Sequence, residues 1–230
     1  MDQTLLNNTR TWKIHLYGDS DNLGLIKDLS KRIGILKKLR KYLPDDKFKQ
    51  IIAGIFTSKL IFCITVWGGI WEVSGQQINI RNTSISKKAM QKLQVLQNKS
   101  LRMLSGLDYL TPTETLLKHC NVLSVHQLVS YHISCQVYKI KSTKLPNYHY
   151  NRLFLNNNNN NENRVAIHPR AARSNTPRVE YKLSLGRSNF FYQASKIWSL
   201  IDDQTRNAQT IEAFKNYCRK WTLDHVPIKP

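Results

Sequence analysis

Lys88, Lys92, Lys99 and Arg102 follow one another at intervals of four, seven and three residues in a stretch without a single acidic residue, SKKAMQKLQVLQNKSLRMLSG (86–106). On an α-helix this spacing places the four cations on one side. The apolar residues fall on the other side: Ala89, Met90, Leu93, Leu96, Leu101 and Leu104. Exposed helix faces usually mix charges, because like charges four residues apart repel each other. A stripe of cations alone suits an anionic partner, and the chemistry that it predicts is phosphate binding.

The composition of the whole chain points the same way. Its 230 residues include 35 Lys and Arg against 15 Asp and Glu, a formal net charge of +20. Two further segments, 31–41 and 164–187, are rich in cations and poor in acids, and they supply more candidate phosphate contacts: Lys37, Lys38, Lys41, Arg170, Arg173 and Arg178. Such a surface attracts nucleic acid or anionic membrane, and composition does not choose between these partners.

The sequence contains no recognisable catalytic motif in addition to these cations. Asp19 and Asp21 in YGDSD could hold a divalent ion, but they alternate instead of adjoining, and we interpret them as residues of a solvated turn. Several residues of types that bind zinc lack a closely spaced Cys pair: His119, Cys120, His126, His132 and Cys135. We therefore expect no catalytic residue, metal or cofactor in this chain. The cysteines fit reduced thiols of an intracellular protein, nuclear or cytoplasmic.

The elements that must position the basic stripe are predicted to be mainly α-helical. We expect a helix from Leu23 to a stop at Pro44, and then an apolar helix that ends at Gly68–Gly69. A polar loop, 74–84, leads to the basic helix. A capping box at Thr111–Glu114 predicts a short helix through Lys118, and Ser124 caps the next helix, which extends to about Lys141.

Six consecutive asparagines mark a change of character after these helices. Segment 144–163 is predicted to be a linker, because a polar low-complexity tract cannot form a packed core. Beyond it, 164–230 is predicted to be a small, basic C-terminal region, with a strand at 179–185 and helices at 188–201 and from Thr210 onwards. Residues 1–22 form a ragged start with a short strand at 12–17, and residues 23–143 form a helical bundle.

The apolar segment 51–71, IIAGIFTSKLIFCITVWGGIW, reaches the lower limit of length for a membrane span. Lys59 lies near its middle, where a charge costs about 2.5–3.5 kcal/mol on insertion. A buried helix explains the segment better, and we expect no membrane span. Two alternatives to nucleic-acid binding stay open: a basic, membrane-associated protein anchored by this segment, and a relic without function.

Five stretches, in this order, also carry a family resemblance: LSKRIGILKKLRKYLP, FTSKLIFCITVWGGIW, MQKLQVLQNKSLRMLSG, GRSNFFYQASKIWSLI and FKNYCRKW. Together they resemble the C-terminal, thumb and post-thumb part of the reverse transcriptases of non-LTR (LINE-type, jockey-like) retrotransposons, from about Leu23 to Trp221. The resemblance implies a helical thumb-like bundle whose basic helices grip RNA, DNA or a hybrid duplex.

That family polymerises DNA with Mg²⁺ held by aspartates of a palm domain, N-terminal to the part that this chain resembles. The chain has no Phe/Tyr-Ala-Asp-Asp motif, and YGDSD does not replace it. The resemblance therefore implies a nucleic-acid-binding fragment of an RNA-directed DNA polymerase, whose partners include a palm and fingers domain. We expect it not to polymerise alone.

Overall fold

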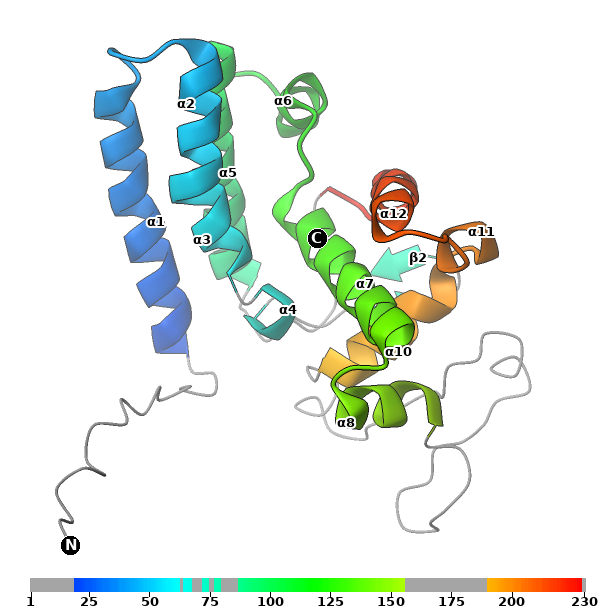
Figure 1. Cartoon of the computed structure of the whole chain (residues 1–230). Helices are drawn as coiled ribbons and strands as arrows, with labels where there is room; N and C mark the ends of the chain where they lie inside the picture. The colour runs from blue at the N-terminus through cyan, green and yellow to red at the C-terminus, as the bar shows by residue number, and fades with distance from the viewer. Residues whose placement is uncertain are drawn as a thin grey trace, which may run out of the picture.

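The computed structural model of the chain describes residues 19–62, 64–67, 72–74, 77–79, 87–155 and 190–228. The described residues are mainly α-helical, as the sequence predicted. Helix α1, the segment that contains α2 and α3, and helix α5 lie side by side, and α7 leads from them to α10 and α12 (Figure 1). The predicted strands at 12–17 and 179–185, and the run of asparagines, lie outside the described residues.

Helix α1 (Asp19–Leu39) begins four residues earlier than predicted and ends before Pro44. Its backbone already includes Asp19 and Asp21, so the interpretation of these two as turn residues was wrong. The turn that follows is held by Arg40, which donates hydrogen bonds to the carbonyl of Leu43 (3.2 Å) and to Oδ1 of Asp45 (2.6 Å). Arg40 therefore links the end of α1 to the start of α2.

The apolar segment is not one continuous helix. It consists of α2 (Asp45–Ile51), the π-helical turn η2 (Ile52–Thr57), α3 (Ser58–Ile61) and α4 (Ile64–Trp67), with an extended ψ of 121° at Phe62. Its buried residues recur every four positions: Phe48, Ile52, Phe56, Leu60 and Ile64. A four-residue repeat drifts by about 40° per step around an α-helix. The wider π-helical turn offsets this drift and keeps the five side chains on one face.

The structure corrects the prediction of an unbroken helix to Gly68–Gly69, since the break comes at Phe62. The five buried side chains of this apolar segment, from Phe48 to Ile64, belong to the core of the protein. Among the described residues, none of the helices combines the length and the apolar character that crossing a bilayer requires.

Part of the predicted loop 74–84 forms an antiparallel hairpin instead. Strand β1 (Glu72–Ser74) pairs with β2 (Gln77–Asn79), with Val73 opposite Ile78. Helix α5 (Lys87–Ser105) follows and ends at Gly106, where a φ of 68° favours glycine.

The predicted capping box at Thr111–Glu114 is not formed, since α6 (Thr113–Cys120) has Pro112 at its N-cap position and no side-chain cap hydrogen bond. The carboxylate of Glu114 pairs with Lys118 (2.8 Å) instead. A true capping box opens α7 (Val125–Thr143). There the amide of Gln127 donates to the hydroxyl of Ser124, and the amide of Ser124 donates to the side chain of Gln127.

Helix α7 contacts α4 and α5, which precede it in the chain, and α10 and α12, which follow it, so it lies at the centre of the fold. Its buried apolar residues share one core with α1, α5, α10 (Phe190–Leu200) and α12 (Ile211–His225). The helix α11 (Asp203–Arg206), which the sequence analysis missed, begins at an Asp202 cap whose carboxylate accepts from the amide of Thr205. The predicted helices at 188–201 and from Thr210 are confirmed.

The beginning of the predicted linker is helical. Helix α8 (Asn147–Tyr150) and the π-helical turn η3 (Asn151–Leu155) follow α7, and Leu153 is buried in the common core. The apolar spacing of Tyr150, Leu153 and Phe154 outweighs the polar composition of the neighbouring asparagines, because these three side chains pack against the core.

Candidate nucleic-acid interface

Helix α5 separates its residues as the sequence predicted. Five of the six apolar residues assigned to its inner side are buried: Ala89, Met90, Leu93, Leu96 and Leu101. Leu104 is half-buried against the same core. The side chains of Lys88, Lys92 and Lys99 are exposed. The helix therefore has a firmly packed inner side, and its lysines play no part in that packing.

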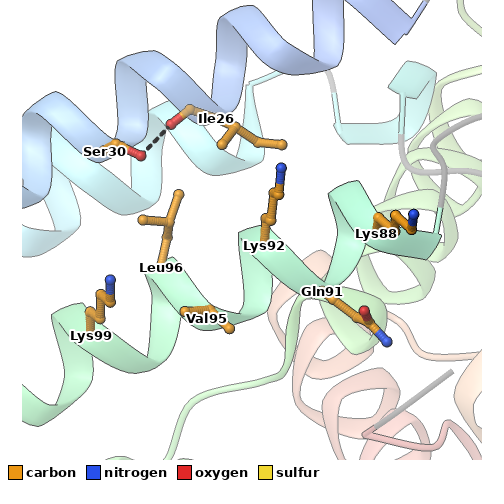
Figure 2. A pocket seen from close by; sticks show the side chains of 8 residues that line it. All are labelled: Ile26, Ser30, Lys88, Gln91, Lys92, Val95, Leu96 and Lys99. Carbon is orange, nitrogen blue, oxygen red and sulfur yellow. Dashed lines mark hydrogen bonds between the residues drawn. The ribbon is translucent and has the colours of Figure 1, made fainter.

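An open groove runs between α5 and α1, and the three lysines line it. They share it with Gln91, Val95 and Leu96 of α5 and with Ile26 and Ser30 of α1. Figure 2 shows Lys92 and Leu96 pointing from α5 toward α1, with Ile26 pointing back toward Lys92. The hydroxyl of Ser30 donates to the carbonyl of Ile26 (2.7 Å), within its own helix. The groove thus has an apolar floor and a row of ammonium groups along α5.

The groove lysines form no ion pair among the described residues. The carboxylate of Asp28, on α1, is engaged elsewhere: it lies 3.4 Å from Nε of Arg32 and 3.4 Å from Nζ of Lys59. Asp28 is two residues from Ser30, which places it about 200° around the helix from the groove. Nothing in the described part of the chain thus neutralises the row of lysines.

Lys37 lies on the side of α1 that lines the groove. Ile26, Ser30, Ile33 and Lys37 follow each other at spacings of four, three and four, so they share one face of α1. Helices α1 and α5 run in the same direction (Figure 1). Lys37, Lys38 and Lys41 are all exposed near the C-terminal end of α1, and none of the three is among the residues that line the groove.

Arg102 differs from the three lysines because the fold itself uses its side chain. Its Nη2 donates to the carbonyl of Thr111 (2.9 Å), and its guanidinium carbon lies 5.3 Å from the ring centroid of Tyr109. Arg102 thus holds the loop that follows α5. The other predicted contacts, Arg170, Arg173 and Arg178, lie outside the described residues.

The wall that α1 contributes to the groove was not predicted from the sequence. The four-residue and three-residue spacings of Ile26, Ser30, Ile33 and Lys37 were a usable signal for a shared helix face. Which helix this face would meet depends on tertiary packing, and the sequence pattern does not contain that information.

The alternative zinc site does not form in the described part of the chain, where no group of three or more His, Cys, Asp or Glu residues is placed to hold a metal. His126 is buried, and burial lowers its pKa to about 4. Burial and the nearby Lys139 also lower the pKa of His132. Both histidines therefore remain neutral in the folded protein at pH 7.

Comparisons with protein-family models, with curated proteins and with solved structures find no match to this chain.

Proposed function

We propose that this chain binds nucleic acid, and that the groove between α1 and α5 holds the phosphate backbone. The observation that carries the proposal is the row formed by Lys88, Lys92 and Lys99. These three exposed ammonium groups line one groove and have no carboxylate partner among the described residues. Along the helix axis the row extends about 16 Å, a length that covers several successive phosphates of one strand.

The shape and charge of the groove favour a phosphate backbone as the ligand. A linear row of lysines offers point charges without the planar geometry that reads base edges, so it contributes affinity more than sequence specificity. The net charge of +20 adds a long-range attraction for any polyanion.

We further propose, from the sequence resemblance, that the chain is the thumb-like C-terminal part of a non-LTR retrotransposon reverse transcriptase. The helical fold and the basic groove are compatible with that role. Polymerisation is not proposed for this chain alone, because its sequence has no palm motif with adjacent aspartates. A palm and fingers domain would be its partner in such an enzyme.

Reversal of two groove charges tests the binding proposal. The variant Lys92→Glu/Lys99→Glu should weaken binding to a labelled DNA or RNA–DNA hybrid duplex about a hundredfold at low salt, as fluorescence anisotropy would measure. Each reversal removes an attraction and adds a repulsion, which together cost about 1.4 kcal/mol, or tenfold in affinity.

A matched control variant has the same net charge as Lys92→Glu/Lys99→Glu. The variant Lys139→Glu/Lys220→Glu reverses two exposed lysines on α7 and α12. It should lose only the small part of the affinity that comes from net charge. Equal losses in the two variants would mean that charge alone drives binding, and would reject the groove as the site.

A further inference from the structure

The loop between α5 and α6 carries two large side chains into solvent. Tyr109 is 75% exposed and Leu110 is 83% exposed. Residues 108–111 form a tight turn, in which the amide of Thr111 donates to the carbonyl of Asp108 (3.1 Å). The carboxylate of Asp108 also accepts a hydrogen bond from the amide of Tyr109 (2.5 Å). The two side chains are thus displayed on a backbone held by several hydrogen bonds.

Arg102 fixes the position of the aromatic ring. It donates from Nη2 to the carbonyl of Thr111 (2.9 Å), and its guanidinium group lies 5.3 Å from the centroid of the Tyr109 ring. The cation supports one side of the ring. Since three quarters of the side chain is exposed, the opposite side of the ring faces solvent.

This supported ring lies in line with the groove. Arg102 is three residues beyond Lys99 and seven beyond Val95, so it continues the face of α5 that lines the groove. A polyanion that follows the lysines toward the C-terminal end of α5 therefore reaches Arg102 and the ring above it.

We propose that Tyr109 is a stacking platform for an unpaired base of the nucleic acid whose backbone lies on Lys88, Lys92 and Lys99. This inference rests on the proposed function and names the ligand more narrowly, as a strand with at least one unpaired nucleotide at the Tyr109 end. A base has an aromatic face of its own, and stacking on an exposed aromatic side chain contributes about 1–3 kcal/mol per base. A blunt duplex offers only the terminal pair, which is already stacked.

The test compares two ligands of equal charge. One is a labelled DNA hairpin with a single-stranded thymidine tail, and the other is the same hairpin with a tail of abasic sugar-phosphates. The wild-type chain should bind the thymidine tail about 5-fold to 100-fold more tightly, as stacking predicts. Tyr109→Ala should abolish this preference, Tyr109→Phe should keep it, and Tyr217→Ala, on α12, should leave it unchanged.

The outcomes separate this inference from the proposed function. If Lys92→Glu/Lys99→Glu loses binding while Tyr109→Ala keeps the full preference for the thymidine tail, the platform is rejected and the groove stands. If the wild-type chain binds neither hairpin, both proposals are rejected. Circular dichroism of each variant confirms that the exposed substitutions leave the fold intact.

Discussion

Helices α5 and α12 each bury one apolar side, and each carries several cations on the rest of its surface. On α12, Arg219 donates to the side-chain oxygen of Asn121 (3.0 Å) and to its backbone carbonyl, at the left-handed residue that ends α6. The same helix also contains acids, Glu212 and Asp224. On α5 there is no acid, and its groove lysines have no ion-pair partner in the part of the chain that the structure describes.

The cations of α12 and α5 differ in what they contact. Arg219 joins α12 to the end of α6, so its charge and hydrogen bonds belong to the fold. Lys88, Lys92 and Lys99 repel one another and take no part in the packing, and we propose an external anion as their partner. Arg102 shows that a single helix can combine both uses, because it belongs to α5 and yet holds the loop beyond it.

The largest expected effect concerns the packing of α12. Phe214 is fully buried, and its ring stacks on Tyr138 with centroids 4.3 Å apart. Phe214→Ala should lower the free energy of unfolding by about 3–5 kcal/mol, because it removes apolar contacts and leaves a cavity. Urea unfolding followed by circular dichroism measures this loss. A loss below about 1 kcal/mol would contradict the assignment of Phe214 to the core.

The next effect is a dependence of stability on pH at α7. The pKa of His126 is lowered by burial to about 4, whereas an unfolded histidine titrates near 6.5. Between these values the unfolded chain binds more protons than the folded one. The free energy of unfolding should therefore fall as the pH drops from 6.5 to 4, by up to about 3 kcal/mol for this group, and should not change through His126 above that window.

Urea unfolding at pH 7 and pH 4.5 measures this change, with His126→Gln as the comparison. The lowered pKa of His132 adds a loss of the same sign in both proteins. The wild type should therefore lose more stability on acidification than His126→Gln does. Equal losses in the two proteins would show that His126 does not titrate as its burial predicts.

A smaller effect contrasts one cation from each helix. Arg219→Gln should cost about 0.5–1.5 kcal/mol of stability, because it disrupts the hydrogen bonds to Asn121. Lys99→Gln should change stability by less than about 0.5 kcal/mol, because its side chain is exposed and has no ion-pair partner among the described residues. Binding should respond in the opposite way, with the larger loss for Lys99→Gln. If Lys99→Gln were the more destabilising variant, the distinction between the two helices would fail.

The sequence predicted the helices α5, α7 and α12 better than it predicted helix breaks and the caps of other helices. The separation of α5 into a buried and a basic side, the cap at Ser124 and the helix that starts at Thr210 all follow from local spacing, and all three are confirmed. The helix break at Phe62 and the missing capping box at Thr111 were not predicted, because the local apolar pattern and the Thr-x-x-Glu spacing are compatible with either outcome.

The same limit applies to the candidate site. The lysines of α5 were predicted because their spacing and the absence of acids are local features. The groove itself requires α1 as a second wall, and Ile26 and Ser30 reach it only through tertiary packing. Arg102 was predicted as a phosphate contact from its spacing, and no local pattern indicated that it would hold Thr111.

The most direct test of the central claim is the salt dependence of duplex binding by the wild type and by Lys88→Gln/Lys92→Gln/Lys99→Gln. Each phosphate contact contributes about −0.7 to −0.9 to the slope of log affinity against log salt concentration. If the three lysines contact phosphates, the slope of the triple variant should be shallower than that of the wild type by about 2 to 3. Equal slopes for the two proteins would contradict the claim that the groove between α1 and α5 holds the nucleic-acid backbone.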